Sequence, residues 1–527
     1  MKRFGMSKVE QGWALSSVAV AVAVLAGCGG GGGNSTTVDN SAIPLTVPKA
    51  TCGPGDVPES GLQGQVPASV RAAGFKGFNC NLTLIGQSRG DGASWQHAFF
   101  TDGAGHNCNY YDTSSSTVNR THQGVVAIDN TDPTKPTPTA YLTTIGMNDP
   151  WESLKVNNRR QLLGAVNALN GNGGPELDLY DLSGDCRSPQ LLSSLAVNAP
   201  APGASAIAVR GHEGSFAPDG LTYYASNLSP GYVYPIDITN TTQPKMLGQF
   251  FMPGPVQRTH GMSISDDGMR AYFTIFGGGA ASAASAPANA ASATNGVVIA
   301  DVSDFQNRVQ NPQMRVISTL IIPDGSASQH TIEIKIQGKK YLVEADEGGS
   351  GGNNAAGWAR ACAAGYPAWN MARLIDISDE TKPVVVSRMQ LEMNDPAKCD
   401  QVIPDLAGLS GFTYGSHYCS VDNKQSATTL ACGYFESGIR VFDIRDPQRP
   451  KEIAYYNPAA VTTPSPGSQN NRTAATGRPD HCSAQIRLDA ATKTLSTTCQ
   501  DNGFLSLKFR DGVWPFPETT TPPGQQN

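Results

Sequence analysis

The chain has 527 residues, with 38 lysines and arginines against 44 aspartates and glutamates, a formal net charge of −6 and only 16% charged residues. No segment is rich in lysine and arginine, which argues against nucleic acid as a partner and against an electrostatic hold on acidic lipid. The length alone would allow two or three ordinary domains, but internal repeats favour a single architecture.

The first residues have the pattern of an export signal. A positive start precedes an apolar run from residue 14 to residue 26, which is too short to span a bilayer, and the run ends on LAGC, whose cysteine is Cys28. This segment resembles the lipobox of bacterial lipoproteins. The resemblance implies cleavage before Cys28, diacylation of that residue, and attachment to a membrane by lipid. Gly29 in the next position implies an outer-membrane lipoprotein that faces the periplasm or the cell surface.

The segment after the lipobox has the composition of a flexible linker. Residues 29–33 are all glycine and are followed by small polar residues. We therefore assign residues 1–28 to the signal peptide and residues 29–50 to a tether that separates the lipid from a folded domain.

One phrase recurs along the rest of the chain: apolar residues around an aspartate, then a polar turn, then another β-rich run. It reads GVVIADVS at 296–303 and GIRVFDI at 438–444. Two strand-like runs precede each phrase, and Asp-Gly between such runs is a strong hairpin signal. Four antiparallel strands per copy predict the blade of a β-propeller. The aspartates of the six complete copies are Asp129, Asp181, Asp237, Asp301, Asp376 and Asp443.

These phrases resemble the LVIVD repeat of bacterial β-propellers, a resemblance that implies an all-β fold and covers the chain after about residue 79. A seventh copy has Lys508 in place of the aspartate and lacks a fourth strand, whereas residues 78–86 look like a strand without a blade. We therefore predict a seven-bladed β-propeller over residues 51–516, in which the N-terminal strand completes the last blade and removes an open edge. Residues 517–527 are predicted to be a disordered tail.

The cysteines predict disulfides. Without Cys28, ten of the 11 cysteines remain, and an even number in an exported chain is typical of a disulfide framework. Two pairs flank the first hairpins of copies six and seven, and a third pair lies in two long loops expected on the same face. These predicted pairs are Cys419–Cys432, Cys482–Cys499 and Cys362–Cys399. Pairing among the other four stays open at this point, and we take Cys52 with Cys80 and Cys108 with Cys186.

Six of the eight histidines stand at one phase of the repeat, where each first strand begins. First strands line the central channel of a propeller, so these side chains are expected at one mouth of that channel. The six are His97, His212, His260, His330, His417 and His481, and the second copy has Glu152 in their place. Two explanations without a binding function stay open: duplication from a histidine-bearing ancestor, or a histidine in each blade that bonds the backbone of its neighbour.

The functional interpretation of this ring is a transition-metal site. Neutral imidazole is a ligand for zinc, copper, iron and nickel, and rigid converging strands would preorganise several rings. We expect three or four imidazoles, with Glu152 as ligand or general base, to bind one ion, with copper and zinc favoured. Acids at the ends of second strands would orient the imidazoles, or be ordinary loop acids. They are Glu344, Asp346, Glu347, Glu436 and Asp501.

Several motifs for other chemistry do not occur in the sequence: it has no phosphate-binding glycine loop, no His-Glu-x-x-His and no haem attachment site. Two classes of function stay open. One is a binding or scaffold lipoprotein that holds a protein, a glycan or a small molecule on the channel face. The other is a metal-dependent oxidoreductase or hydrolase.

Overall fold

The computed structural model describes residues 35–37, 46–113, 121–168, 176–199, 207–208, 211–228, 231–251, 258–283, 287–406, 412–461 and 477–516. The predicted signal peptide with Cys28, most of the predicted tether and the predicted tail lie outside these ranges. Among the described residues, no helix is long and apolar enough to cross a membrane.

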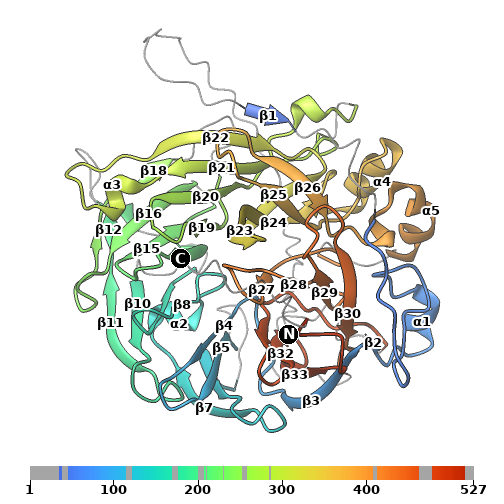
Figure 1. Cartoon of the computed structure of the whole chain (residues 1–527), viewed down its shortest axis with the longest axis horizontal. Coiled ribbons are helices and arrows are strands. Elements are labelled where there is room, and N and C mark those ends of the chain that lie inside the picture. The colour runs from blue at the N-terminus through green and yellow to red at the C-terminus, as the bar shows by residue number, and fades with distance from the viewer. Residues whose placement is uncertain are drawn as a thin grey trace, which may run out of the picture. The chain divides into compact units, whose positions relative to one another are not determined.

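Seven antiparallel sheets surround a central axis, which confirms the predicted seven-bladed β-propeller (Figure 1). From the axis outward, blades 1 and 2 contain β4 (His97–Thr101), β5 (Asn107–Asp112), β6 (Val125–Asp129), β7 (Thr137–Leu142), and β8 (Lys155–Asn157), β9 (Leu162–Val166), β10 (Glu176–Asp181), β11 (Gln190–Ala196). Blades 3 and 4 contain β14 (Glu213–Phe216), β15 (Thr222–Ser226), β16 (Tyr232–Asp237), β17 (Lys245–Met246) with β18 (Phe250–Phe251), and β19 (Met262–Ile264), β20 (Arg270–Ile275), β21 (Gly296–Asp301), β22 (Arg315–Ile321).

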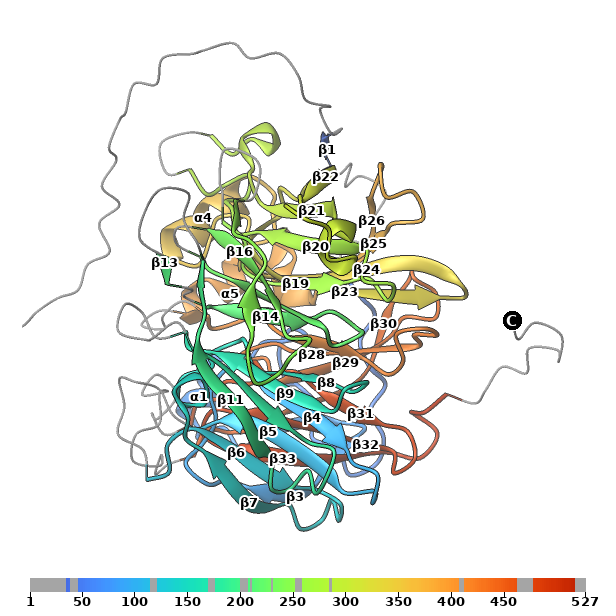
Figure 2. The same cartoon turned by 90° about the vertical axis from the view of Figure 1, so that its left-hand side faces the viewer.

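The remaining three blades follow the same order. They contain β23 (Gly325–Ile336), β24 (Lys339–Gly349), β25 (Ala372–Asp376), β26 (Val384–Arg388); β27 (Cys419–Val421), β28 (Thr429–Gly433), β29 (Ile439–Asp443), β30 (Lys451–Asn457); and β31 (Arg487–Asp489), β32 (Thr494–Cys499), β33 (Gly503–Phe509). Figure 2 shows the blades edge-on, with the long β23–β24 hairpin of blade 5 projecting beyond its neighbours.

The repeated aspartate closes the turn after each third strand. In all six complete copies its Oδ1 accepts a hydrogen bond from the backbone N–H two residues later, at 2.8–3.1 Å. A short carboxylate side chain that bonds the backbone in this way stabilises a turn, which explains why the phrase carries an aspartate there. The Asp-Gly turns at Gly220 and Gly268 have φ values of 72° and 76°, a conformation that glycine adopts without strain.

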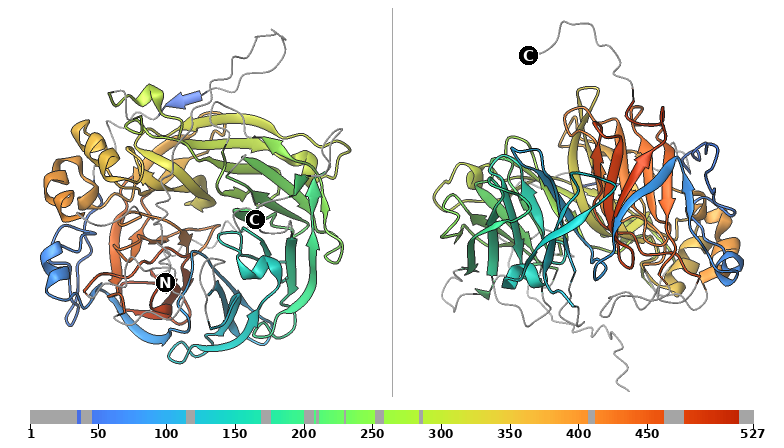
Figure 3. Two further views of the ribbon diagram at one scale, coloured as in Figure 1. Left: turned by 180° about the vertical axis from the view of Figure 1, so that it is seen from behind. Right: turned by 90° about the horizontal axis from the view of Figure 1, so that it is seen from below.

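The N-terminal region closes the ring, as predicted, and adds a strand that was not predicted. β3 (Leu82–Ser88) pairs with β33 and is the fourth strand of blade 7. β2 (Phe78–Cys80) pairs instead with β30 and is a fifth strand on blade 6. Asn81, between them, has a φ of 59°, so the chain turns there from one blade to the next. Figure 3 shows these blue strands beside the orange and red blades.

Folded structure begins before residue 51, within the segment predicted as tether. β1 (Ser35–Thr37) pairs parallel to the outer strand β22. Val47 is buried and its N–H bonds the carbonyl of Gln390, and Pro48 accepts from the N–H of Glu452. The segment from residue 46 onward therefore packs on the outside of blades 5 and 6.

Short helices and a ribbon lie between or outside the blades. The helices are α1 (Ala68–Ala72), α2 (Ile145–Asn148), α3 (Ser303–Gln306), α4 (Ala355–Ala363), α5 (Cys399–Val402) and the 3₁₀ turns η1 (Ala290–Ser292), η2 (Glu392–Asn394), η3 (Pro396–Lys398) and η4 (Pro404–Leu406); the ribbon is β12 (Asn198–Ala199) with β13 (Ile207–Ala208). In Figure 1, α1, α4 and α5 lie together at the outer edge of the ring.

All five predicted disulfides are confirmed. They join Cys419–Cys432, Cys482–Cys499, Cys362–Cys399, Cys52–Cys80 and Cys108–Cys186. Cys419 and Cys432 are directly opposite each other in the β27–β28 pair, as a cross-strand bridge requires. Five disulfides are typical of a protein that folds in an oxidising compartment outside the cytoplasm.

Apolar clusters between adjacent blades hold the first strands rigidly around the axis. One cluster joins Val125 of blade 1 to Leu163 of blade 2, and another joins Val441 of blade 6 to Leu495 of blade 7. Because such interiors are close-packed, side chains that point into the channel from different blades keep fixed relative positions.

A buried ion cluster lies inside blade 5. The Arg373 side chain is 0% exposed and its guanidinium lies 3.3 Å from Asp324, 2.9 Å from Glu344 and 3.1 Å from Asp346. One arginine thus faces three buried carboxylates, so removing it would leave these charges without their common partner.

Candidate metal centre

Five of the predicted residues converge in the central channel. They are Glu152, His212, His260 and His417, which come from the starts of the first strands of blades 2, 3, 4 and 6, and Glu347 from the end of β24. An isolated bridge between Glu152 and Glu213 aligns blades 2 and 3 at this point. The cluster is almost fully buried, and His212, with a side chain 21% exposed, is its most accessible histidine.

The first group of ligand atoms surrounds one carboxylate oxygen. Glu152 Oε2 lies 3.1 Å from His212 Nε2 and 2.9 Å from His260 Nε2, and the two Nε2 atoms are 2.9 Å apart. Ligands around a tetrahedral ion with bonds of about 2.0–2.1 Å are separated by roughly 3.3 Å. A movement of a few tenths of an ångström would therefore fit an ion between these three atoms.

The second group surrounds the other oxygen of the same glutamate. His417 Nε2 lies 2.9 Å from Glu152 Oε1 and 2.8 Å from Glu347 Oε1. Gln329 Nε2 donates to the same Glu152 oxygen at 3.5 Å. Glu152 therefore joins both groups into one cluster.

The outer ring nitrogens fix where the imidazole protons are. His260 Nδ1 lies 2.8 Å from Glu213 Oε2 and His417 Nδ1 lies 3.0 Å from the carbonyl oxygen of Ser483. A carboxylate and a carbonyl only accept, so both Nδ1 atoms carry hydrogen. In a neutral ring, Nε2 then has a lone pair, and it faces carboxylate oxygens. Such a contact is repulsive unless a proton or a metal ion lies between the atoms.

The charges change the pKa values of the cluster in opposite directions. Burial alone would lower the pKa of His260, but Glu152 and Glu347 raise it well above its usual value. Burial would also lower the pKa of His417, but hydrogen bonds to the same two glutamates raise it to about 9. Burial would raise the pKa of Glu152, but the imidazoles hold it well below its usual value.

With neutral imidazoles, the cluster carries two negative charges in excess. Glu152, Glu213 and Glu347 supply three negative charges, and the Lys155 ammonium, 3.4 Å from Glu213 Oε1, supplies one positive charge. Two imidazolium protons or one divalent cation would neutralise the remainder. Two divalent cations would overcompensate it, so one ion fits best.

The other three predicted ring members bond elsewhere. His97 Nδ1 donates to the carbonyl of Gln485 in blade 7, at 2.9 Å, and burial lowers the pKa of His97 to about 4. His330 Nε2 accepts from the N–H of Cys419 in blade 6, and His481 Nε2 donates to the carbonyl of Phe412. All three contacts are made to another blade or to the loop that leads into one. This is the arrangement expected if each histidine bonds the backbone of a neighbouring blade.

The predicted acids also separate. Glu347 belongs to the cluster itself. Glu344 and Asp346 pair with Arg373 in blade 5, and Glu436 lies 3.5 Å from Arg478. Asp501 is buried, and its N–H bonds the carboxylate of Asp480.

Two functional residues were missed in the sequence: Glu213, which orients His260, and Lys155, which pairs with Glu213. Glu213 directly follows His212, and Lys155 follows Glu152 by three residues, so both lie in first strands that already contributed a predicted residue. Their charge inside a channel-lining strand was the available signal. Trp95 and Trp151 also contact the cluster, with ring centroids 5.3 Å from His417 and 6.0 Å from His212.

A further group of possible ligands, at Asp102, His106 and Asp185, is already paired. Arg187 contacts both carboxylate oxygens of Asp185, at 2.8 and 2.7 Å, and Asp102 bonds His106 and the N–H of Cys186. We therefore interpret this group as a structural ion pair.

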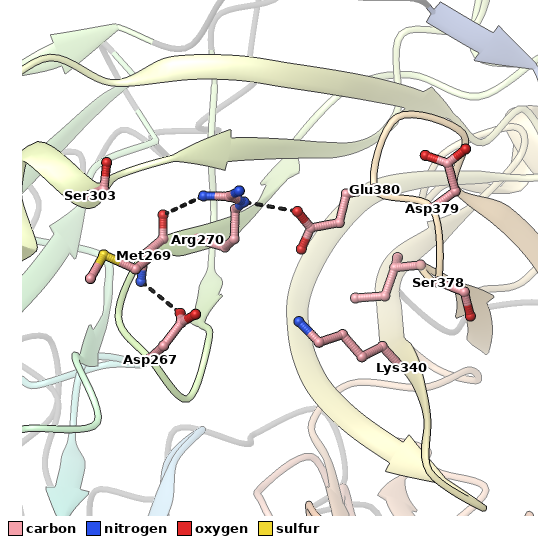
Figure 4. Close-up of a pocket in the computed structure, with 9 residues that line it drawn as sticks. Asp267, Met269, Arg270, Ser303, Lys340, Ser378, Asp379 and Glu380 are labelled. Atoms are coloured by element: carbon pink, nitrogen blue, oxygen red, sulfur yellow. Dashed lines mark hydrogen bonds and ion pairs between the residues drawn. The ribbon is translucent and has the colours of Figure 1, made fainter.

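The channel and the edge of the ring each have a cavity. One, of about 570 Å³, lies on the axis, and Lys155, Glu213 and His330 are among its lining residues. The other, of about 620 Å³, is an open groove between blades 4 and 5 (Figure 4). Two of its lining residues, Arg270 and Glu380, form an ion pair at 2.8 Å, and no histidine is among its lining residues.

Comparisons with known proteins find remote structural similarity only. No family model and no curated protein matches the chain. Solved structures that resemble it include a proposed 6-phosphogluconolactonase from Bacteroides uniformis (13% identity, 77% of this chain and 93% of that chain, TM-score 0.48) and hydrazine synthase from Kuenenia stuttgartiensis (12%, 81% and 97%, 0.47). A third is the β-propeller domain of Cps50 (Swd1) from Myceliophteria thermophila (9%, 81% and 99%, 0.47).

Proposed function

We propose that this chain is a cell-envelope lipoprotein of the LVIVD-repeat type, whose propeller is a ligand-binding module with one divalent transition-metal ion in its central channel. Glu152, His212 and His260 are the ligands, Glu213 orients His260, Glu347 adds negative charge, and His417 contacts both Glu152 and Glu347. One observation carries the proposal. His260 and His417 each donate from Nδ1 to a hydrogen-bond acceptor, so each directs Nε2 toward a carboxylate oxygen of Glu152.

The donor set favours a borderline transition metal. Imidazole nitrogen with carboxylate oxygen suits zinc or copper better than calcium or magnesium, which prefer oxygen alone. Since only His212 is appreciably exposed, a solvent or substrate position would lie beside it. An open position of that kind is what catalytic ions keep, and it favours a metal-dependent oxidoreductase or hydrolase as the second candidate function.

Metal loading tests the proposal. Chelator-washed mature protein, reloaded with zinc or copper, should bind about one ion per chain, and the double variant His212→Ala/His260→Ala should bind almost none. His97→Gln, a buried histidine outside the cluster, and His122→Ala, on the surface, are matched controls that should load as the wild type does. Wild-type protein without bound metal after reloading would refute the proposal.

Loading should also depend on pH. Because the glutamates raise the pKa values of His260 and His417, binding of a divalent ion should displace about two protons, and metal affinity should rise with pH. Calorimetry in buffers of different ionisation enthalpy measures the protons released. Release of no protons at pH 7 would contradict this account of the cluster.

Attachment by lipid has its own test. Cys28→Ser should move the protein from the membrane fraction to the soluble fraction while its melting temperature stays unchanged, because the described propeller does not include this residue. Retention of the variant in salt-washed membranes would contradict the lipoprotein proposal and leave the metal proposal untouched.

A further inference from the structure

The axial cavity beside the metal-binding cluster is called the funnel below. All seven blades contribute to its lining, mostly through their first strands, and its rim is formed by the turns that follow those strands, at residues 158–159, 218, 266 and 422–424. Its volume of about 570 Å³ lies within the range of small-molecule sites, roughly 300–1,000 Å³.

The walls of the funnel carry both polar and apolar side chains, and the apolar ones come from several blades. They include aromatic and branched side chains from blades 1 to 6, and several of these side chains are only partly buried. The residues are Phe99, Val156, Phe216, Ile264, Ile332 and Val421. Burial of an apolar ligand against them would stabilise a complex by about 25 cal/mol for each Å² removed from water.

Lys155 is the cation at the inner end of the funnel. Its side chain is 15% exposed, and its ammonium lies 3.4 Å from Glu213 Oε1 and 4.9 Å from the centroid of the Tyr418 ring. An ammonium group only donates hydrogen bonds, so the group it can bind on a ligand is an acceptor. The other lining cations, Arg159 and Lys424, are exposed in the rim turns, near Asp266 and Asp422.

Glu213 connects this end of the funnel to the metal-binding cluster. One of its oxygens contacts Lys155 and the other lies 2.8 Å from His260 Nδ1. A ligand held by Lys155 would therefore be two contacts away from a metal-binding imidazole.

We infer that the funnel binds a small organic acid with an aromatic-sized apolar part. Its carboxylate would contact the Lys155 ammonium, and its apolar part would lie against the apolar side chains of the walls. This inference rests on the proposed function, which makes the channel a ligand site, and names the class of its ligand. It depends on the shape and charge of the funnel rather than on the ion.

Binding of 2-naphthoate to the mature protein, followed by calorimetry, tests the inference. Lys155→Met, which keeps the length of the side chain, should weaken 2-naphthoate by about tenfold or more, because a hydrogen bond to a charged group is lost. The affinity for the uncharged 2-naphthamide should change far less. Lys451→Met, on the outer strand β30 and outside the funnel, with a side chain 56% exposed, is the control and should leave both affinities almost unchanged.

A second variant keeps the test independent of Lys155. Ser215 lines the funnel and is partly exposed, so Ser215→Trp should fill it and abolish binding of both probes. Failure of 2-naphthoate to bind the wild type, equal binding by Ser215→Trp, or no effect of Lys155→Met would each overturn the inference. Metal content is measured on the same samples: probe binding without metal would refute the metal proposal alone, and metal without probe binding would refute the funnel ligand alone.

Discussion

Replacing Glu152 by glutamine should lower the affinity for a divalent transition-metal ion by about 100-fold or more. Glu152 supplies one oxygen to each half of the cluster, so the variant removes the charge that both halves share. Loss of groups that merely orient ligands costs about 10–100-fold, and loss of a ligand should cost at least as much. Metal titration of the chelator-treated protein measures this effect.

The matched control for that variant is Glu436→Gln. Glu436 is another buried glutamate predicted to support the ring, but the structure places it near Arg478 and outside the cluster. It should keep the wild-type metal affinity. If both variants bind metal as the wild type does, Glu152 is not a ligand.

Replacing Arg373 by methionine should lower the free energy of unfolding by about 3–5 kcal/mol at neutral pH. The variant leaves Asp324, Glu344 and Asp346 buried without the guanidinium that faces all three. Denaturant titration measures the loss. Arg187→Met, at a surface ion pair that is 35% exposed on the arginine side, is the control and should leave the free energy of unfolding almost unchanged.

The pH dependence of that loss has a definite sign. Burial already raises the pKa of Glu344 and raises that of Asp346 well above its usual value, and without Arg373 both should rise further. The folded variant then binds more protons than the unfolded chain, so its stability falls as pH rises. The deficit should be smaller at pH 5 than at pH 8. A deficit within 1 kcal/mol of that of Arg187→Met would contradict the assignment of this cluster as a structural core.

The fold followed from local chemistry that is visible in the sequence. The aspartate that closes the turn after each third strand, such as Asp301 bonding the N–H of Ser303, recurs because every blade needs the same turn. The orphan strand before the first copy identified the closing blade. The strand β2 was not predicted, because only the turn at Asn81 separates it from β3 and the sequence shows one run of alternating apolar and polar residues.

The cluster in the channel was predictable only in part, because the repeat phase gives the position of a residue in the sequence but not the register of its strand. In blade 5, β23 has a bulge between Ser328 and His330. A shift of one residue moves a side chain to the other face, so Gln329 rather than His330 reaches Glu152. In blade 1, Gln96 bonds the carbonyl of Glu152 while His97 turns to Gln485.

Glu213 could not be predicted from the sequence for a different reason. Its role depends on a contact between blades 3 and 4, which no pattern within one repeat reveals. Histidines that share a phase therefore indicated the region where these side chains gather, but not all members of the cluster.

Anomalous diffraction from crystals loaded with zinc, measured across the zinc absorption edge, tests the central claim most directly. We expect one strong peak in the channel, about 2.0–2.2 Å from a carboxylate oxygen of Glu152 and from the Nε2 atoms of His212 and His260. A peak only at Asp102, His106 and Asp185, or none after loading, would contradict a metal site at the centre of this propeller.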